Sequence, residues 1–150
     1  MGERYHIATG VIYDGRGGEG FLGDLLLANG KVEAVSKSSL PQNQDYQFID
    51  ATGMWVTPGF IDIHTHYDGE VEIAPELSES VRHGVTSILM GSCGISMVMG
   101  DPEELSDMFT RVEGMPSHYI KETLKQKKDW DGPAEYLQHL EGLALGPNIG

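Results

Sequence analysis

Residues 58–66 read Pro-Gly-Phe-Ile-Asp-Ile-His-Thr-His, and this stretch decides how the chain can be organised. A Pro-Gly turn followed by an apolar run predicts a short buried strand. His64 and His66 follow at positions i and i+2, which point to the same side of a strand. Two imidazoles offered together from a rigid element are typical ligands of zinc and similar metals. A bare His-x-His can also fall by chance in a loop, but here the turn and the strand favour a metal site.

The composition predicts a globular protein, because 39% of its 150 residues are hydrophobic and 22% are charged, without a long biased run. The formal net charge of -13 argues against nucleic acid or an anionic membrane as a partner, since both require a basic surface. The single cysteine excludes an internal disulfide. No apolar signal segment begins the chain, and no stretch approaches the ~20 apolar residues needed to cross a bilayer. We therefore expect a cytoplasmic protein.

Residues 5–57 are expected to form β structure. Within them Asn29-Gly30 lies between two apolar segments, and it predicts a tight hairpin because both residues tolerate a positive φ. Short strands are expected at residues 47–50 and 54–57, separated by a turn. The glycines of residues 15–20 are interpreted as turns and not as a phosphate loop, since no helix beginning with Lys-Ser or Lys-Thr follows them.

A strand–helix–strand unit is expected around the histidine pair. Residues 74–82 begin with a proline in the first turn and stop before a glycine, which predicts a short helix. Residues 85–90 are an apolar run, so the strands on either side of the helix should be parallel. Both strands then end at one sheet edge, which puts Cys93 beside His64 and His66. Thiolate with imidazole favours zinc over magnesium or calcium, although a cysteine is often only a small buried hydrophobe.

Three further helices are predicted by capping signals and by helical periodicity. Asp101 and the proline after it begin the first, and Gly114 ends it. The others are expected at residues 119–128 and 133–141, followed by the approach to another strand. The inward-facing residues should be Leu105, Met108, Phe109, Val112, Ile120, Leu124, Tyr136, Leu137 and Leu140. Alternating strands and helices make the expected fold class α/β.

The stretch of residues 50–66 resembles the start of the catalytic barrel in the amidohydrolase superfamily. More narrowly, three segments resemble the D-aminoacylase branch, the N-acyl-D-amino-acid deacylases: His64-Thr-His-Tyr-Asp68, Ser78-Glu-Ser-Val-Arg-His-Gly-Val-Thr86 and Gly91-Ser-Cys-Gly94. Residues 111–116 and 145–148 are similar to that branch as well. Many amidohydrolases bridge two metals with a carboxylated lysine, whereas in this branch a cysteine supplies a ligand, and Cys93 stands at that place.

The resemblance implies a β-sandwich domain, partly built from residues 1–57, and a (β/α)8 barrel whose first βα units are residues 58–150. It implies one or two zinc ions, with His64 and His66 at one metal position and Cys93 at a neighbouring, tighter one. The implied reaction hydrolyses a small N-acyl-D-amino acid to a carboxylate and a D-amino acid. In the family the general-base aspartate and two further histidine ligands lie on later barrel strands, so no catalytic residue is expected within this chain.

A (β/α)8 barrel needs about 200 to 250 residues. We therefore expect the chain to be the N-terminal portion of a longer enzyme and to be inactive alone. Open strand edges would favour association with a complementary C-terminal segment or with further copies of the chain. Two alternatives stay open: a dihydropyrimidinase-like or dihydroorotase-like hydrolase of the same superfamily, and a non-catalytic scaffold. The intact histidines and cysteine argue against the scaffold.

Several polar residues near the expected ligands have two possible roles. Asp68 and Ser92 adjoin the ligands and would either orient them or lie in a solvent-exposed loop. His83 is expected to cap a helix, and a solvated helix face is expected for Glu70, Glu72, Glu76 and Glu79. The histidines without a ligand-like context are His6, His118 and His139.

Overall fold

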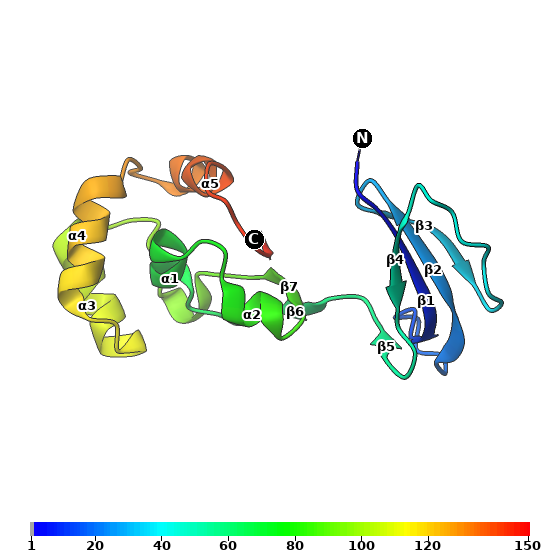
Figure 1. Cartoon of the computed structure of the whole chain (residues 1–150). Coiled ribbons are helices and arrows are strands. Elements are labelled where there is room, and N and C mark those ends of the chain that lie inside the picture. The colour runs from blue at the N-terminus through cyan, green and yellow to red at the C-terminus, as the bar shows by residue number, and fades with distance from the viewer. Residues whose placement is uncertain (1) are drawn as a thin grey trace. The chain divides into compact units, whose positions relative to one another are not determined.

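The computed structural model describes residues 2–150, which form two compact units, one reaching up to Pro58 and the other beginning at Gly59 (Figure 1). Each unit has a sheet of its own, and every helix of the described residues belongs to the second unit. The chain is therefore an α/β protein, as predicted.

The first unit is a five-stranded sheet made of β1 (Arg4–Ile12), β2 (Phe21–Ala28), β3 (Lys31–Ser36), β4 (Gln47–Asp50) and β5 (Trp55–Val56). Strand β1 lies at its centre, antiparallel to β2 and parallel to both β4 and β5. The register of β1 against β2 shifts around Thr9, whose φ is 58°. The segment before this residue pairs with β4 and the segment after it pairs with β5. The predicted β character of residues 5–57 is confirmed.

The predicted hairpin joins β2 to β3. Asn29 and Gly30 have φ values of 53° and 72°, and Ala28 pairs directly with Lys31 across the turn. A two-residue turn with both φ values positive matches the right-handed twist of the strands that it connects. The choice of Asn-Gly therefore sets the pairing next to the turn, and the register shifts between Leu26 and Leu27.

A buried carboxylate organises the polar interior of the first unit. Asp24 accepts hydrogen bonds from the backbone N–H groups of Leu40 (2.8 Å) and Thr9 (3.0 Å), and it lies 2.9 Å from Nε2 of His6. Burial opposes ionisation of this group, but these hydrogen bonds outweigh the effect and lower the pKa of Asp24. His6 is likewise buried.

The second unit contains a parallel sheet in the order β6 (Phe60–Asp62), β7 (Val85–Ile88) and β8 (Asn148–Ile149). Helices α1 (Asp68–Ile73) and α2 (Ser78–Arg82) connect β6 to β7, and the 3-10 turn η1 (Ser92–Gly94) follows β7. Helices α3 (Pro102–Glu113), α4 (Ser117–Lys127) and α5 (Pro133–Glu141) then lead to β8. The predicted parallel pairing of the first two strands is confirmed.

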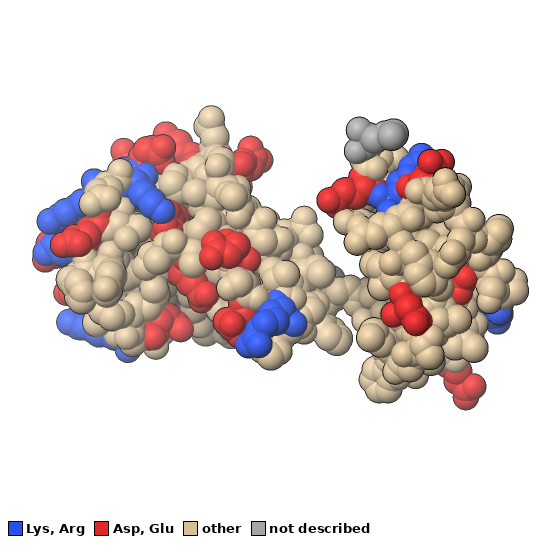
Figure 2. Space-filling model, viewed as in Figure 1, with Lys and Arg blue, Asp and Glu red and all other residues tan. Residues whose placement is uncertain are grey.

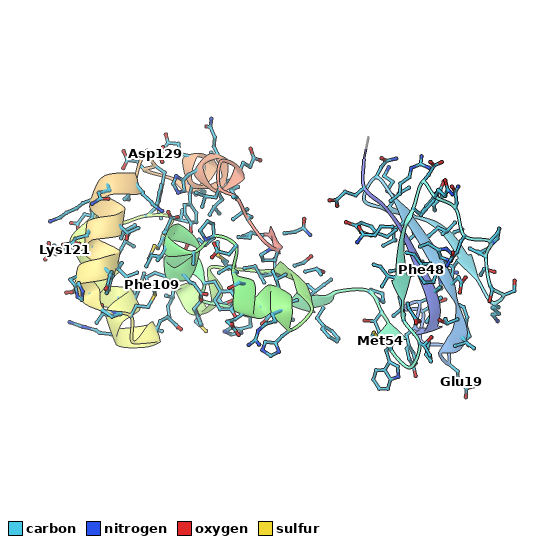
Figure 3. The ribbon with its side chains drawn as sticks, viewed as in Figure 1. Glu19, Phe48, Met54, Phe109, Lys121 and Asp129 are labelled. Carbon is cyan, nitrogen blue, oxygen red and sulfur yellow. The ribbon has the colours of Figure 1, made fainter. Side chains whose placement is uncertain are left out.

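The core of the second unit lies mainly between its helices. Its buried members are Val71, Met97, Leu105, Phe109, Ile120, Leu124, Trp130, Tyr136 and Leu140. Helices α3 and α4 lie side by side, and Phe109 belongs to this core (Figure 3). The indole Nε1 of Trp130 donates a 2.8 Å hydrogen bond to the carbonyl of Met97, so the polar atom of this buried ring is satisfied.

The two ends of α3, predicted from its capping residues, agree with the structure. Asp101 forms a capping box with Glu104, and Gly114 ends α3 in a left-handed conformation. Most of the residues predicted to face inward are buried or half-buried, but Val112 and Leu137 are 47% and 56% exposed. Both predictions were wrong because periodicity locates an apolar face without showing how far the neighbouring helices cover it.

The apolar run before the histidines does form a strand, β6, but its burial was predicted wrongly. Phe60, Ile61 and Ile63 are 62%, 66% and 71% exposed. Among the described residues β6 has a single partner strand, β7, and no packed layer covers these side chains.

The prediction of a single helix over residues 74–82 is also wrong. The structure has α1 before this stretch and α2 within it, and the break falls at Pro75. A proline disfavours the helical conformation in the residue before it. Accordingly Ala74 has φ of -137° and ψ of 71° and ends α1.

Glu72 on α1 is buried, so the prediction of a solvated helix face is wrong for this residue. Its Oε2 lies 2.9 Å from Nε2 of His139, and Nδ1 of that ring lies 3.1 Å from Asp129. Burial raises the pKa of Glu72, although His139 and Lys127 pull in the opposite direction. The His139 ring thus links α1 to α5 and to the segment before α5.

Charged residues of both signs are interspersed over the face drawn in Figure 2. Lys121 of α4, for example, pairs with Glu103 of α3 (Figure 3). None of the helices in residues 2–150 has the length and apolar character that crossing a membrane requires.

Replacing Asp24 with asparagine should destabilise the first unit. One of the acceptor oxygens used by Thr9, Leu40 and His6 is lost, and an unsatisfied buried group costs about 1–3 kcal/mol. Because folding lowers the pKa of Asp24, the stabilisation from its carboxylate is complete above the ordinary carboxyl pKa of ~4. This stabilisation disappears as the pH falls through the pKa of Asp24 in the folded protein. The stabilities of the wild type and the variant should therefore converge in acid.

Amide hydrogen exchange resolved by peptide measures this effect. At pH 7 the variant should lose protection in peptides from β1 and β2, whereas peptides from α3 and α4 in the second unit serve as an internal control. Equal protection of β1 and β2 in both proteins at pH 7 would show that Asp24 does not stabilise this sheet.

Candidate metal centre

His64 and His66 follow the end of β6 and are held by the residue between them. Thr65 is buried, and it donates hydrogen bonds to the carbonyl of Leu89 through its N–H (3.2 Å) and its Oγ1 (2.7 Å). The N–H of Leu89 donates in turn to the carbonyl of Asp62 (2.9 Å). Residues 64–66, here called the histidine segment, are therefore hydrogen-bonded to the chain just beyond β7. The two imidazole rings lie together, with their centroids 5.4 Å apart.

Cys93 lies on η1, beyond the end of β7. Its backbone is in the left-handed region, with φ of 57° and ψ of 18°. This conformation costs a non-glycine residue on the order of 1 kcal/mol and persists only where surrounding contacts fix it. The thiol is exposed, so the alternative of a small buried hydrophobe does not hold.

The structure brings the three predicted ligands together. One ligand atom from each of His64, His66 and Cys93 lies within 4.8 Å of the other two, and Nε2 of His64 is 3.2 Å from Sγ of Cys93. Bonds of about 2.0 Å to nitrogen and 2.3 Å to sulfur separate neighbouring ligands of a tetrahedral zinc ion by roughly 3.3–3.6 Å. The His64–Cys93 pair has nearly this spacing, and a small side-chain movement would bring in His66.

His66 provides an independent indication that these residues fit a metal ion. Its Nδ1 is buried and has no hydrogen-bond partner among the described residues. A buried polar atom without a partner is costly, and a metal can satisfy an imidazole nitrogen as a hydrogen bond would. Thiolate and imidazole donors together suit zinc. The residues present therefore fit a divalent metal of this kind.

The sequence allows two roles for Asp68 and Ser92, which are to orient the ligands or to lie in a solvent-exposed loop. The structure gives the two residues different surroundings. Asp68 is fully buried at the first residue of α1, and its carboxylate accepts hydrogen bonds from the backbone N–H groups of Met97 (3.1 Å) and Gly91 (3.4 Å). Ser92 is half-buried on η1. The backbone contacts of Asp68 were not predictable from the sequence, whose only signal was the closeness of Asp68 to His66.

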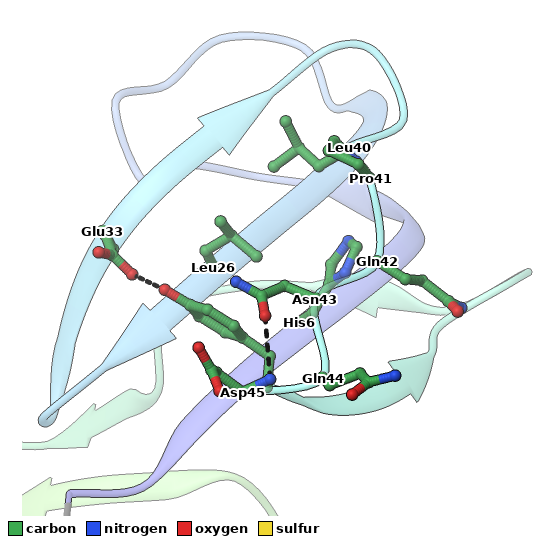
Figure 4. A pocket seen from close by; sticks show the side chains of 10 residues that line it. His6, Leu26, Glu33, Leu40, Pro41, Gln42, Asn43, Gln44 and Asp45 are labelled. Carbon is green, nitrogen blue, oxygen red and sulfur yellow. Dashed lines mark hydrogen bonds between the residues drawn. The ribbon is translucent and has the colours of Figure 1, made fainter.

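A hollow of about 800 Å3 lies in the first unit and is separate from the candidate metal centre. Its lining includes His6, Asn43 and Glu33, together with Tyr46, whose hydroxyl donates to Glu33 (Figure 4). This hydrogen bond raises the pKa of Tyr46. None of the three candidate ligands lines this hollow.

The sequence is similar to known proteins, although no family model matches it. An uncharacterized protein of Mycobacterium tuberculosis is 42% identical over 143 residues, which are 95% of this chain and 23% of that protein. The N-acyl-D-aspartate deacylase of Alcaligenes xylosoxydans xylosoxydans is 38% identical over 91 residues, covering 61% of this chain and 18% of the deacylase.

Solved structures agree with these sequence matches. The crystal structure of D-aminoacylase, a member of a subset of amidohydrolases, matches with a TM-score of 0.72 and 25% identity over 97% of this chain and 28% of that one. The N-acyl-D-glutamate deacylase of Bordetella bronchiseptica, complexed with zinc and a phosphonate inhibitor, matches with a TM-score of 0.56 and 34% identity. That match covers 61% of this chain and 19% of the deacylase.

This chain is similar, in sequence and in structure, to D-aminoacylase and related N-acyl-D-amino-acid deacylases, which are members of the amidohydrolase superfamily. It spans only between 18% and 28% of the length of the four proteins described above.

Replacing Thr65 with valine should loosen the histidine segment. Valine has nearly the same size but lacks the hydroxyl that donates to Leu89, and a lost hydrogen bond costs about 0.5–1.5 kcal/mol. We expect the free energy of unfolding of the second unit to fall by this amount. Urea unfolding followed by the fluorescence of the buried Trp130 measures it, since Trp55 is already 75% exposed.

The matched control is Thr86→Val, which makes the same chemical change at an exposed position of β7. Its unfolding curve should overlay that of the wild type. If Thr65→Val also overlays the wild-type curve, the hydroxyl of Thr65 does not hold the histidine segment in place.

Proposed function

We propose that this chain supplies histidine and cysteine ligands to a zinc-dependent amidohydrolase that cleaves the amide bond of N-acyl-D-amino acids. The observation that carries the proposal is the meeting of His64, His66 and Cys93 within 4.8 Å. The N-acyl-D-aspartate and N-acyl-D-glutamate deacylases that match this chain support the substrate class. The products would be a carboxylate and a free D-amino acid.

The donor set supports zinc as the metal, with one or two ions bound. His64 and His66 would serve one metal position and Cys93 a neighbouring one. The 3.2 Å between the His64 and Cys93 ligand atoms suits either one shared ion or two neighbouring ions. Neighbouring structures have been solved with zinc in one case and with copper chloride in another, which supports a divalent metal.

A bound zinc ion would act as a Lewis acid toward the amide carbonyl and make hydroxide available near neutral pH. The residues of this chain contribute by holding the ligands in position: Thr65 fastens the histidine pair to Leu89, and η1 presents the exposed thiol of Cys93. The general-base aspartate and two further histidine ligands would lie on later barrel strands, as the family resemblance implies. No catalytic base is assigned to residues 2–150.

The proposed fold of the whole enzyme places residues 1–57 in a β-sandwich domain. Residues 58–150 would form the first βα units of a (β/α)8 barrel, in which metal sites lie at the carboxyl ends of the strands. The parallel order of β6, β7 and β8 supports this assignment. So does the exposure of Phe60, Ile61 and Ile63, because further barrel elements would cover such a strand.

The cysteine distinguishes this proposal from its alternatives. In a dihydropyrimidinase-like or dihydroorotase-like enzyme a bridging lysine would make Cys93 dispensable, and a thiol 3.2 Å from His64 would have no purpose. A non-catalytic scaffold would not require an intact cluster. The arrangement of the three residues therefore favours the deacylase.

Cobalt(II) added to the 150-residue chain should produce a sulfur-to-cobalt charge-transfer band, because cobalt accepts the ligands that zinc accepts. The chain has one cysteine, so any such band reports on Cys93. Cys93→Ser should abolish the band. His64→Ala should weaken cobalt binding by at least about tenfold, or ~1.4 kcal/mol. Absorption titration measures both effects, and zinc should displace the cobalt signal.

The matched control for the histidine variant is His118→Ala, which removes an exposed histidine from α4. It should leave the band and the affinity unchanged. A folded wild-type chain without a thiolate band, or a band that persists unchanged in both His64→Ala and His66→Ala, would refute the proposed metal site.

The deacylase activity is tested in a chimera, since the chain alone is expected to be inactive. In the chimera the 91 residues of this chain that match the Alcaligenes N-acyl-D-aspartate deacylase replace the corresponding segment of that enzyme. We expect release of D-aspartate from the N-acyl substrate, loss of activity after chelation and recovery after zinc is added. A chimera that folds and binds zinc but hydrolyses no N-acyl-D-amino acid would contradict the deacylase assignment and leave the metal site standing.

A further inference from the structure

We infer that Asp68 is a positioning residue for Cys93: its buried carboxylate holds both ends of the backbone segment that presents the thiol. This inference rests on the proposed metal site, in which Cys93 is a ligand. It assigns Asp68 neither contact with the metal nor a role in proton transfer. The role comes from hydrogen bonds that the carboxylate accepts from the backbone.

The geometry of these hydrogen bonds defines a clamp. Oδ2 of Asp68 accepts from the N–H of Gly91 (3.4 Å), and Oδ1 accepts from the N–H of Met97 (3.1 Å). Gly91 precedes η1 and Met97 follows it, so Cys93 lies on the loop between the two contacts. The two oxygens of one rigid, planar carboxylate fix the distance between the two ends of this loop.

The far end of the clamp is anchored in the core of the second unit. The side chain of Met97 is fully buried, and the carbonyl of Met97 accepts a 2.8 Å hydrogen bond from Nε1 of Trp130. Asp68 itself is fully buried, which strengthens its hydrogen bonds and makes an unsatisfied carboxylate costly. Asp68 therefore ties the loop to the buried core of the second unit.

The backbone conformation of Cys93 explains why such a clamp is needed. Cys93 has a left-handed φ of 57°, which a residue with a β-carbon does not prefer. Because its two ends are held at Gly91 and Met97, the short loop has little freedom to change its backbone conformation. When one contact is lost, Cys93 can return to an ordinary conformation, which would move Sγ away from its position 3.2 Å from Nε2 of His64.

Residues 64–68 thus position both the imidazoles and the thiol of the candidate site. This segment contains His64 and His66, and Thr65 binds it to the carbonyl of Leu89. Asp68, at its end, accepts hydrogen bonds from the loop of Cys93. The spacing of Asp68 two residues after His66 places the ligands and the clamp on one rigid piece of chain. A displacement of this piece would move the imidazoles and the thiol together.

The test uses Asp68→Asn in the 150-residue chain. Asparagine keeps the shape of aspartate, but its Nδ2 cannot accept a hydrogen bond, so the N–H of Gly91 or of Met97 loses its acceptor. We expect cobalt affinity to fall about 10- to 100-fold, as for other residues that orient metal ligands. At saturating cobalt the sulfur-to-cobalt band of the folded protein should also be weaker. A general loss of stability would reduce the amount of folded protein but not the band of each folded chain.

Asp24→Asn is the matched control. Asp24 is a buried aspartate that also accepts two backbone N–H groups, but it lies in the first unit. This variant should leave the cobalt band and affinity unchanged. An Asp68→Asn protein with the wild-type band and affinity would overturn the inference about Asp68 while leaving the proposed metal site intact. Absence of the band in the wild type would instead count against the metal site.

A second measurement tests the clamp without cobalt, and its wild-type part applies even if Asp68→Asn does not fold. In the metal-free wild type, the amides of Gly91 and Met97 should exchange hydrogen at least about tenfold more slowly than unprotected amides, because the clamp exists before metal binds. In a folded Asp68→Asn protein at least one of them should lose this protection. Unprotected exchange of both amides in the wild type would overturn the clamp, whatever the outcome with cobalt.

Discussion

The parallel pairing of β6 with β7 is the constraint on which the candidate metal centre depends. It brings the chain after β6 next to the chain after β7, and Thr65 closes this contact with two hydrogen bonds to Leu89. Because parallel strands end at the same edge of a sheet, the histidines of one connection and the cysteine of the next can meet. Without this pairing the ligands would lie on two unrelated loops.

Buried carboxylates serve the same purpose in both units. Asp24 collects the backbone N–H groups of Thr9 and Leu40, and Asp68 collects those of Gly91 and Met97. Thr9 itself has a positive φ, and the loop held by Asp68 contains Cys93, which also has one. A carboxylate can accept several hydrogen bonds at once and can therefore hold backbone that regular secondary structure does not satisfy. The cost of its burial is offset by these bonds.

Local signals predicted much of the fold. The Asn29-Gly30 hairpin, the Asp101 cap of α3 and the extent of α5 follow from chemistry within a few residues, so they could be identified from the sequence. The errors arose where distant parts of the chain decide the outcome. The exposure of Leu137 and the burial of Glu72 depend on which elements pack against α5 and α1, and periodicity does not contain that information.

The sequence by itself determined the types of ligand and their spacing along the chain, because His-x-His after a strand and a cysteine after the next strand are local patterns. It also determined that the two strands should be parallel. Only the tertiary structure decided that Cys93 adopts a left-handed conformation on η1, that its thiol lies 3.2 Å from His64, and that Asp68 holds its loop. These features depend on contacts between residues 23 to 29 positions apart, whose geometry exists only once the chain is folded.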